Sequence, residues 1–131
     1  MSKKSQSAIE FIILIGAMFF FFILLMQAFQ KNTADKTIAQ RNLIANDITL
    51  TVQNEINLAH SSRDGYERTF SLPDKIQNIN YTINLTEGFI YLQTTDGNIA
   101  LAHPVKNITG NVQKGDNVIK KVDREVFINR P

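Results

Sequence analysis

Cysteine is absent from the 131-residue chain, and histidine occurs only twice. Without cysteine, the chain forms neither a disulfide nor a cysteine-based metal or redox site. His60 lies near the end of an expected helix and His103 precedes a proline, and neither belongs to a catalytic or metal-binding motif. The sequence also lacks a phosphate-binding loop, a dinucleotide-binding glycine motif and a calcium loop. A chain of this size has room for one membrane segment and one small domain, so we predict no enzymatic activity and no cofactor.

An excess of positive charge is also largely missing. The chain has 14 basic and 12 acidic residues, a net charge of +2. Lys3 and Lys4 account for this surplus, so a product without them is neutral. The isoelectric point near 9 is therefore no argument for nucleic-acid binding, and no nucleic-acid partner is predicted. Lys114, Lys120 and Lys121 are interpreted as part of a solvated turn.

A long apolar run dominates the N-terminal region. Within residues 11–29, Gln27 is the only clearly polar side chain. As a helix rising about 1.5 Å per residue, this run is roughly 28 Å long, close to the hydrocarbon thickness of a bilayer. Secretory signals usually have a shorter apolar core followed by a small-residue cleavage site. We therefore expect the segment to stay in the mature protein and to lie in a membrane, with Lys3 and Lys4 favouring a cytoplasmic N-terminus.

Glycine and proline are missing between Phe29 and Gly65, which allows one helix to continue through this stretch. Apolar residues recur there at helical spacing, on one face: Ala34, Ile38, Ala45, Ile48, Val52, Ile56 and Ala59. Residues 47–52 also alternate like a strand, but helical flanks on both sides favour helix. We predict a continuous helix from about Gln6 to about His60, ended by the polar turn 61–65.

Beyond Tyr66 the hydrophobic period changes to two, which is typical of β-strands. Strands are expected near residues 66–72, 79–86, 89–93, 98–102, 118–122 and 126–128, with turns at 87–88, 96–97 and 114–117. These elements predict an antiparallel sheet of about five or six strands, with one apolar face covered by the helix. The expected fold class is α+β.

Three Asn-x-Thr sequons lie in this expected sheet region. Their asparagines are Asn80, Asn84 and Asn107, which are candidate N-glycosylation sites if this region faces outward. The strand alternation places Asn80 and Asn84 on the face that points away from the helix. Chance is an equally good explanation, because the chain is rich in asparagine and threonine.

A single carboxylate, Glu10, stands at the start of the apolar run. Interaction with the helix N-terminal dipole would explain an acid in a first helical turn. The surrounding residues 3–11 (KKSQSAIEF) resemble, however, the class III signal peptide of archaeal type IV pilin-like proteins. That pattern has a short basic leader, Gln as first mature residue, often Ser third, Glu fifth, then Phe and an apolar helix. This chain has Ala8 at the third position, and Ser5 rather than glycine before the cut.

The resemblance implies a pilin lollipop fold, and residues 68–73 and 80–83 look like segments of the same group. It divides the chain into a leader (1–5), a transmembrane or filament-core half of the helix (6–29), an amphipathic half (30–62) and a β-sheet head (63–131). It implies cleavage between Ser5 and Gln6 by a membrane prepilin peptidase. An assembly ATPase and a membrane platform protein would then move subunits from the lipid into an extracellular filament.

Under this resemblance, Glu10 and Phe11 are assembly residues. Cleavage creates an α-amino group on Gln6, and the Glu10 carboxylate pairs with that group on a neighbouring subunit, so that subunits associate through their N-terminal helices. The predicted function is a non-enzymatic subunit, a pilin or minor pilin. The alternative is a solitary membrane-anchored extracytoplasmic binding or adhesion module that is not polymerised.

Overall fold

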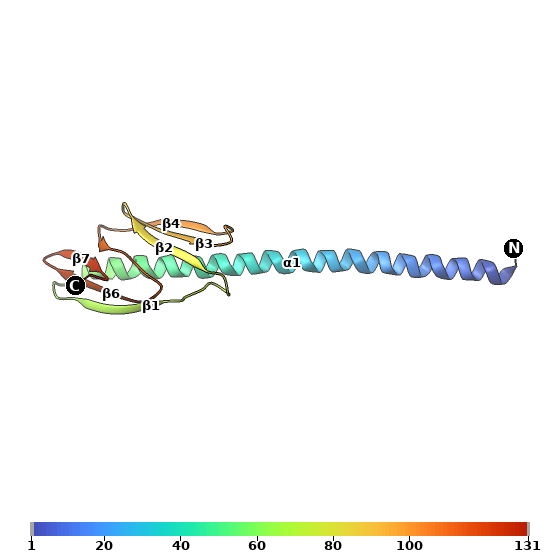
Figure 1. The fold of residues 1–131 in the computed structure, drawn as a ribbon, viewed down its shortest axis with the longest axis horizontal. Helices are drawn as coiled ribbons and strands as arrows, with labels where there is room; N and C mark the ends of the chain where they lie inside the picture. The colour runs from blue at the N-terminus through green and yellow to red at the C-terminus, as the bar shows by residue number, and fades with distance from the viewer. Residues whose placement is uncertain (1, 131) are drawn as a thin grey trace. The chain divides into compact units, whose positions relative to one another are not determined.

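The computed structural model describes residues 2–130. Its first element is one unbroken helix, α1 (Lys3–Ser61) (Figure 1). The chain divides into two compact units, residues 1–38 and residues 39–131, and α1 supplies part of each. The predicted continuous helix is therefore confirmed, including residues 47–52, because a strand pattern six residues long cannot override helical flanks on both sides.

Within the second unit, one face of α1 is buried. The buried residues follow helical spacing: Ala45, Ile48, Thr49, Val52, Ile56 and Ala59. Thr49 is accommodated because its hydroxyl donates a hydrogen bond to the Asn46 carbonyl at 2.9 Å. The predicted apolar stripe began earlier, at Ala34 and Ile38, and this part was wrong: both side chains are exposed. They belong to the first unit, where the structure contains helix alone.

Three strands form an antiparallel sheet in the order β2-β3-β4. Their bounds are β2 (Tyr81–Thr86), β3 (Phe89–Thr94) and β4 (Ala100–Pro104). The β2–β3 turn is the predicted pair Glu87 and Gly88, with φ angles of 51° and 81°. Positive φ at both central residues is the turn geometry that matches the twist of a two-residue hairpin.

Four further strands form a second sheet in the order β1-β6-β7-β5. Their bounds are β1 (Glu67–Leu72), β5 (Thr109–Gly110), β6 (Gly115–Val122) and β7 (Glu125–Ile128). Prediction of a single antiparallel sheet was wrong in two respects: there are two sheets, and β5 pairs parallel to β7. Gly110 has a φ of 116°, and a Cβ there would lie 2.0 Å from the Ile128 carbonyl oxygen, so β5 requires glycine.

The two sheets and α1 share one core. In the view of Figure 1, the strands β2 to β4 run above the green part of α1, and β1 and β6 run below it. The core joins the helix face to the inner side chains of both sheets, including Phe70, Tyr81, Ile90, Ile119 and Ile128. The fold class is α+β, as predicted: a 59-residue helix whose C-terminal part packs against small β-sheets.

The C-terminus of α1 is held by a lysine on β6. Lys121 Nζ donates hydrogen bonds to the carbonyl oxygens of His60 (2.7 Å) and Ser62 (2.8 Å). A cation at this position satisfies orphan carbonyls and opposes the negative end of the helix dipole. The interpretation of Lys121 as part of a solvated turn was therefore wrong.

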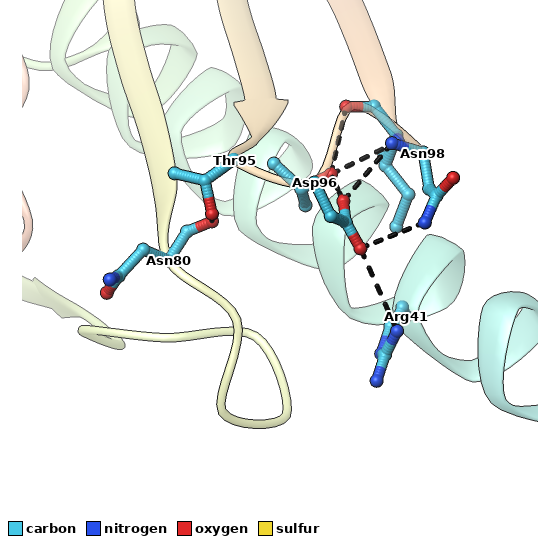
Figure 2. Close-up of polar contacts among 7 residues, drawn as sticks. Arg41, Asn80, Thr95, Asp96 and Asn98 are labelled. Carbon is cyan, nitrogen blue, oxygen red and sulfur yellow. Dashed lines mark hydrogen bonds and ion pairs between the residues drawn. The ribbon is translucent and has the colours of Figure 1, made fainter.

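The β3–β4 turn is fixed to α1 through Asp96 (Figure 2). The Asp96 carboxylate accepts hydrogen bonds from the Thr94 hydroxyl at 2.6 Å and from the backbone N–H of Asn98 at 3.1 Å. Arg41 on α1 lies 3.9 Å from the same carboxylate. The Thr94 hydrogen bond first, and then the Asn98 backbone N–H, lower the pKa of Asp96 below its ordinary value, because both stabilise the charged form.

Candidate functional site

The predicted cleavage residues lie in the first turns of α1. The Ser5 N–H and hydroxyl both donate to the Ser2 carbonyl oxygen, at 3.0 and 2.9 Å. Gln6 N–H reaches the same oxygen at 3.4 Å. Ser5 and Gln6 are both exposed, and few hydrogen bonds hold the end of a helix, so this turn opens at low cost.

Glu10 lies four residues after Gln6, which places the two on the same side of the helix, one turn apart. Its side chain is exposed, and Phe11 beside it is 63% exposed. The ion pairs found among residues 2–130 are Arg41–Asp96 and Arg68–Glu55. Glu10 thus has no ionic partner within the described part of the chain.

The helix surface around and after Glu10 is apolar on every side. Its large side chains are exposed at the following positions: Ile9, Phe11, Ile12, Ile13, Leu14, Ile15, Met18, Phe19, Phe20, Phe21, Phe22, Ile23, Leu24, Leu25, Met26 and Phe29. α1 is long and apolar enough here to cross a membrane, and none of its apolar window is buried. A helix that is hydrophobic all round needs an apolar environment on all sides, either lipid or other helices.

A second exposed apolar stripe lies on α1 within residues 39–131. Leu43, Leu50 and Leu58 are 70%, 37% and 42% exposed. Their spacings of seven and eight place them on one helix face, opposite the buried residues from Ala45 to Ala59. The predicted stripe was the buried face alone, although the same periodicity also marks these three leucines.

The three sequon asparagines are all exposed, in different settings. Asn80 precedes β2, and its carbonyl oxygen accepts hydrogen bonds from the Thr95 N–H and hydroxyl, at 2.9 and 3.1 Å (Figure 2). Asn84 lies within β2, opposite Tyr91 on β3. Asn107 lies between β4 and β5, and its carbonyl oxygen is 2.7 Å from His60 Nε2.

Groups that could perform acid–base or metal chemistry are dispersed. Among residues 2–130, no cluster of three or more His, Asp or Glu side chains is placed to hold a metal ion. His60 is occupied by the contact with Asn107 at the end of α1. What the described surface offers instead is contact area, namely the apolar part of α1 from Ile9 to Phe29, with Glu10 near its start.

Comparison of the chain with models of protein families, with curated proteins and with solved structures gave no match. Functional inference therefore starts from the chain's own residues and architecture. Two features carry it: a long, apolar, fully exposed N-terminal helix, and small β-sheets packed on the C-terminal part of that helix.

Proposed function

We propose that the protein is a pilin or minor pilin, a structural subunit of an extracellular archaeal type IV pilus-like filament. A long N-terminal helix packed on small β-sheets is consistent with a pilin-like fold. The observation that carries the proposal is the exposed carboxylate of Glu10 at the start of an apolar surface. α1 begins at Lys3 and has no acid in its first turn, so the helix dipole does not account for Glu10. A filament core would supply the acid with a partner.

The partner in this proposal is an α-amino group. A prepilin peptidase cuts between Ser5 and Gln6 on the cytoplasmic side, and the new amine on Gln6 has an ordinary pKa near 8, so it is largely cationic. Packed among helices at low dielectric, the amine and the Glu10 carboxylate of a neighbouring copy attract each other strongly. Removing one member of such a buried pair costs about 3 to 5 kcal/mol, enough to fix the axial register of the subunits.

The leucine stripe on the second unit supports the same proposal. Single exposed leucines are normal on protein surfaces. The exposed Asp47 and Asn54 separate these three, but the leucines repeat at two-turn intervals on one helix face. Leu43, Leu50 and Leu58 would be covered by another copy in a filament. A solitary anchored domain would leave them in water.

Before assembly, residues 6–29 hold the subunit in the membrane as a single span with a cytoplasmic N-terminus. An assembly ATPase and a membrane platform protein then transfer subunits from lipid into the filament, where neighbouring helices replace the lipid. These partners follow from the resemblance of residues 3–11 to the class III signal peptide.

The alternative is a solitary membrane-anchored extracytoplasmic binding or adhesion module. One observation favours it: Ser5 and Gln6 lie within the helix that begins at Lys3, as they would in an anchor that is not cut. Mass spectrometry of the N-terminus in the native membrane distinguishes the two. A chain that starts at Gln6 supports the pilin, and a chain that retains Lys3 and Lys4 supports the anchor.

The Glu10→Ala variant tests the assembly role. In the native cells we expect this full-length variant to be cleaved and to reach the membrane at wild-type levels, but to be lost from the sheared filament fraction. Asp35→Ala is the matched control, because it removes an acid from the same helix beyond the apolar run. Wild-type filament yield from Glu10→Ala would show that Glu10 has no role in assembly.

A further inference from the structure

The outer face of the β2-β3-β4 sheet combines amide, hydroxyl and aromatic side chains. Residues that point away from the core are exposed on all three strands: Thr82, Asn84 and Thr86 on β2; Phe89, Tyr91 and Gln93 on β3; and Ala100, Ala102 and Pro104 on β4. Phe89 is 40% exposed and Tyr91 is 45% exposed. Two aromatic rings therefore lie in water beside a sequon.

The strand register places Asn84 against these rings. Asn84 is the direct cross-strand partner of Tyr91, and Thr86, the last residue of the sequon, is the partner of Phe89. The Phe89 and Tyr91 rings are in contact, with centroids 6.1 Å apart. Directly opposed side chains have Cβ atoms about 5 Å apart, and diagonal neighbours are within reach of an aromatic ring. A group attached to Asn84 Nδ2 can thus lie on both rings.

We infer that Asn84 carries an N-linked glycan whose first sugar packs on the rings of Tyr91 and Phe89. The co-reactant is an oligosaccharide linked through its C1 carbon to a lipid phosphate. An Nδ2–C1 bond forms, the C1–O bond to phosphate breaks, and the lipid phosphate leaves with the bonding electrons. Nδ2 loses one proton. The inference requires residues 39–131 to lie outside the cytoplasm, as they do in both the proposed function and its alternative.

The other two sequons lack these features. Thr82, in the Asn80 sequon, donates its hydroxyl to the Gln93 carbonyl oxygen at 3.5 Å. Asn80 precedes β2 and has no cross-strand partner on β3. Thr109, in the Asn107 sequon, is half-buried in β5. Thr86 is exposed beside Asn84, so the hydroxyl that a sequon requires is accessible there.

Glycopeptide mass spectrometry of the full-length chain from its native cells tests the modification. Chymotryptic cleavage after Tyr81 separates Asn80 from Asn84. We expect a sugar mass on the Asn84 peptide that disappears in Asn84→Gln and persists in the matched variant Asn80→Gln. An unmodified Asn84 overturns the inference. The N-terminal residue of the same sample tests the proposed function separately, so a bare Asn84 in a chain that starts at Gln6 refutes the glycan and leaves the pilin intact.

Thermal unfolding tests the packing of the sugar on the rings. We expect Asn84→Gln to lower the melting temperature by about 4 °C, the shift produced by losing one ring contact in a small domain. The decrease should become smaller when Tyr91 is replaced by serine, which leaves only the Phe89 ring, and should persist in full in Tyr91→Phe, which keeps both rings. An equal decrease in the Tyr91 and Tyr91→Ser backgrounds would show that the sugar does not rest on Tyr91.

Discussion

Replacing Lys121 by methionine should destabilise residues 39–131 by about 2 kcal/mol. Its ammonium group donates to the carbonyl oxygens of His60 and Ser62 at 2.7 and 2.8 Å, where α1 ends. Methionine preserves much of the side-chain packing volume but can donate to neither carbonyl. The variant therefore removes the two hydrogen bonds and the cation together.

The magnitude follows from three terms. Each of the two hydrogen bonds from the charged group contributes about 1.5 to 3 kcal/mol, and a cation at a helix C-terminus adds about 0.3 to 1 kcal/mol. Taking the ammonium partly out of water opposes both. Lys121 is only half-buried, so water replaces part of what is lost in the variant. The desolvation cost, several kcal/mol for a buried ion, offsets much of this sum, which leaves a net loss of about 2 kcal/mol.

The chain itself provides a selective probe. It contains three tyrosines and no tryptophan, and Tyr66, Tyr81 and Tyr91 all belong to the second unit. Tyrosine fluorescence of the full-length protein in detergent therefore reports on that unit alone, as does circular dichroism in the tyrosine band, which lies at longer wavelength than the phenylalanine bands. With an m-value of about 1 kcal/mol/M in urea, the midpoint of Lys121→Met should fall by about 2 M.

The matched control is Lys120→Met, which changes the same charge at the neighbouring position of β6. Lys120 is also half-buried but points to the other side of the strand, so its replacement should change stability by less than about 0.5 kcal/mol. Lys121→Arg should recover part of the loss. Equal midpoints for Lys120→Met and Lys121→Met would refute the assigned role of Lys121.

Two further predictions concern buried polar groups. Tyr81 is fully buried and its hydroxyl donates to the Pro73 carbonyl oxygen; burial first, and then the nearby Asp74 carboxylate, raise the pKa of Tyr81 to about 12. In the unfolded chain the tyrosine hydroxyl loses its proton near pH 10. The contribution of Tyr81 to the free energy of unfolding is therefore complete below pH 10 and falls by about 1.4 kcal/mol per pH unit towards pH 12. Subtracting the free energy of unfolding of Tyr81→Phe, measured in urea at each pH, should isolate this slope. Asn117→Ala should lower stability by about 2 to 4 kcal/mol in the same urea assay, because the buried Asn117 amide bridges the backbone of Gln113 and the side chain of Asn129.

The local elements were predictable because each has a local cause. The long helix followed from the absence of glycine and proline between Phe29 and Gly65, and the β2–β3 turn from Glu87 and Gly88. Strand partners were not predictable in this way. β1 pairs with β6, so Arg68 faces Ile119, and nothing in a period of two specifies a partner fifty positions away. The sequence therefore predicted one sheet where the structure has two.

The turn between β6 and β7 also depends on a distant contact. Its central residues, Asp123 and Arg124, have φ angles of 51° and 67°, where glycine or asparagine is expected. A distant contact helps to hold this geometry, because Arg124 N–H donates to the Asp64 carboxylate at 2.9 Å. The antiparallel pairing of residues 118–122 with 126–128 agrees with the predicted strands. The separate turn predicted at residues 114–117 was wrong from Gly115 onward, because β6 begins there and buries Asn117.

Glu10 stood out in the sequence because a carboxylate is unexpected at the start of an apolar helix. A single chain cannot explain it, since Glu10 has no ionic partner within residues 2–130. Under the proposed function this has a consequence for the order of events. Before cleavage, the nitrogen of Gln6 belongs to a neutral peptide bond, so burying Glu10 among helices would leave its charge uncompensated, at a cost of several kcal/mol. In the proposed filament, cleavage supplies the compensating amine, so we predict that processing precedes assembly.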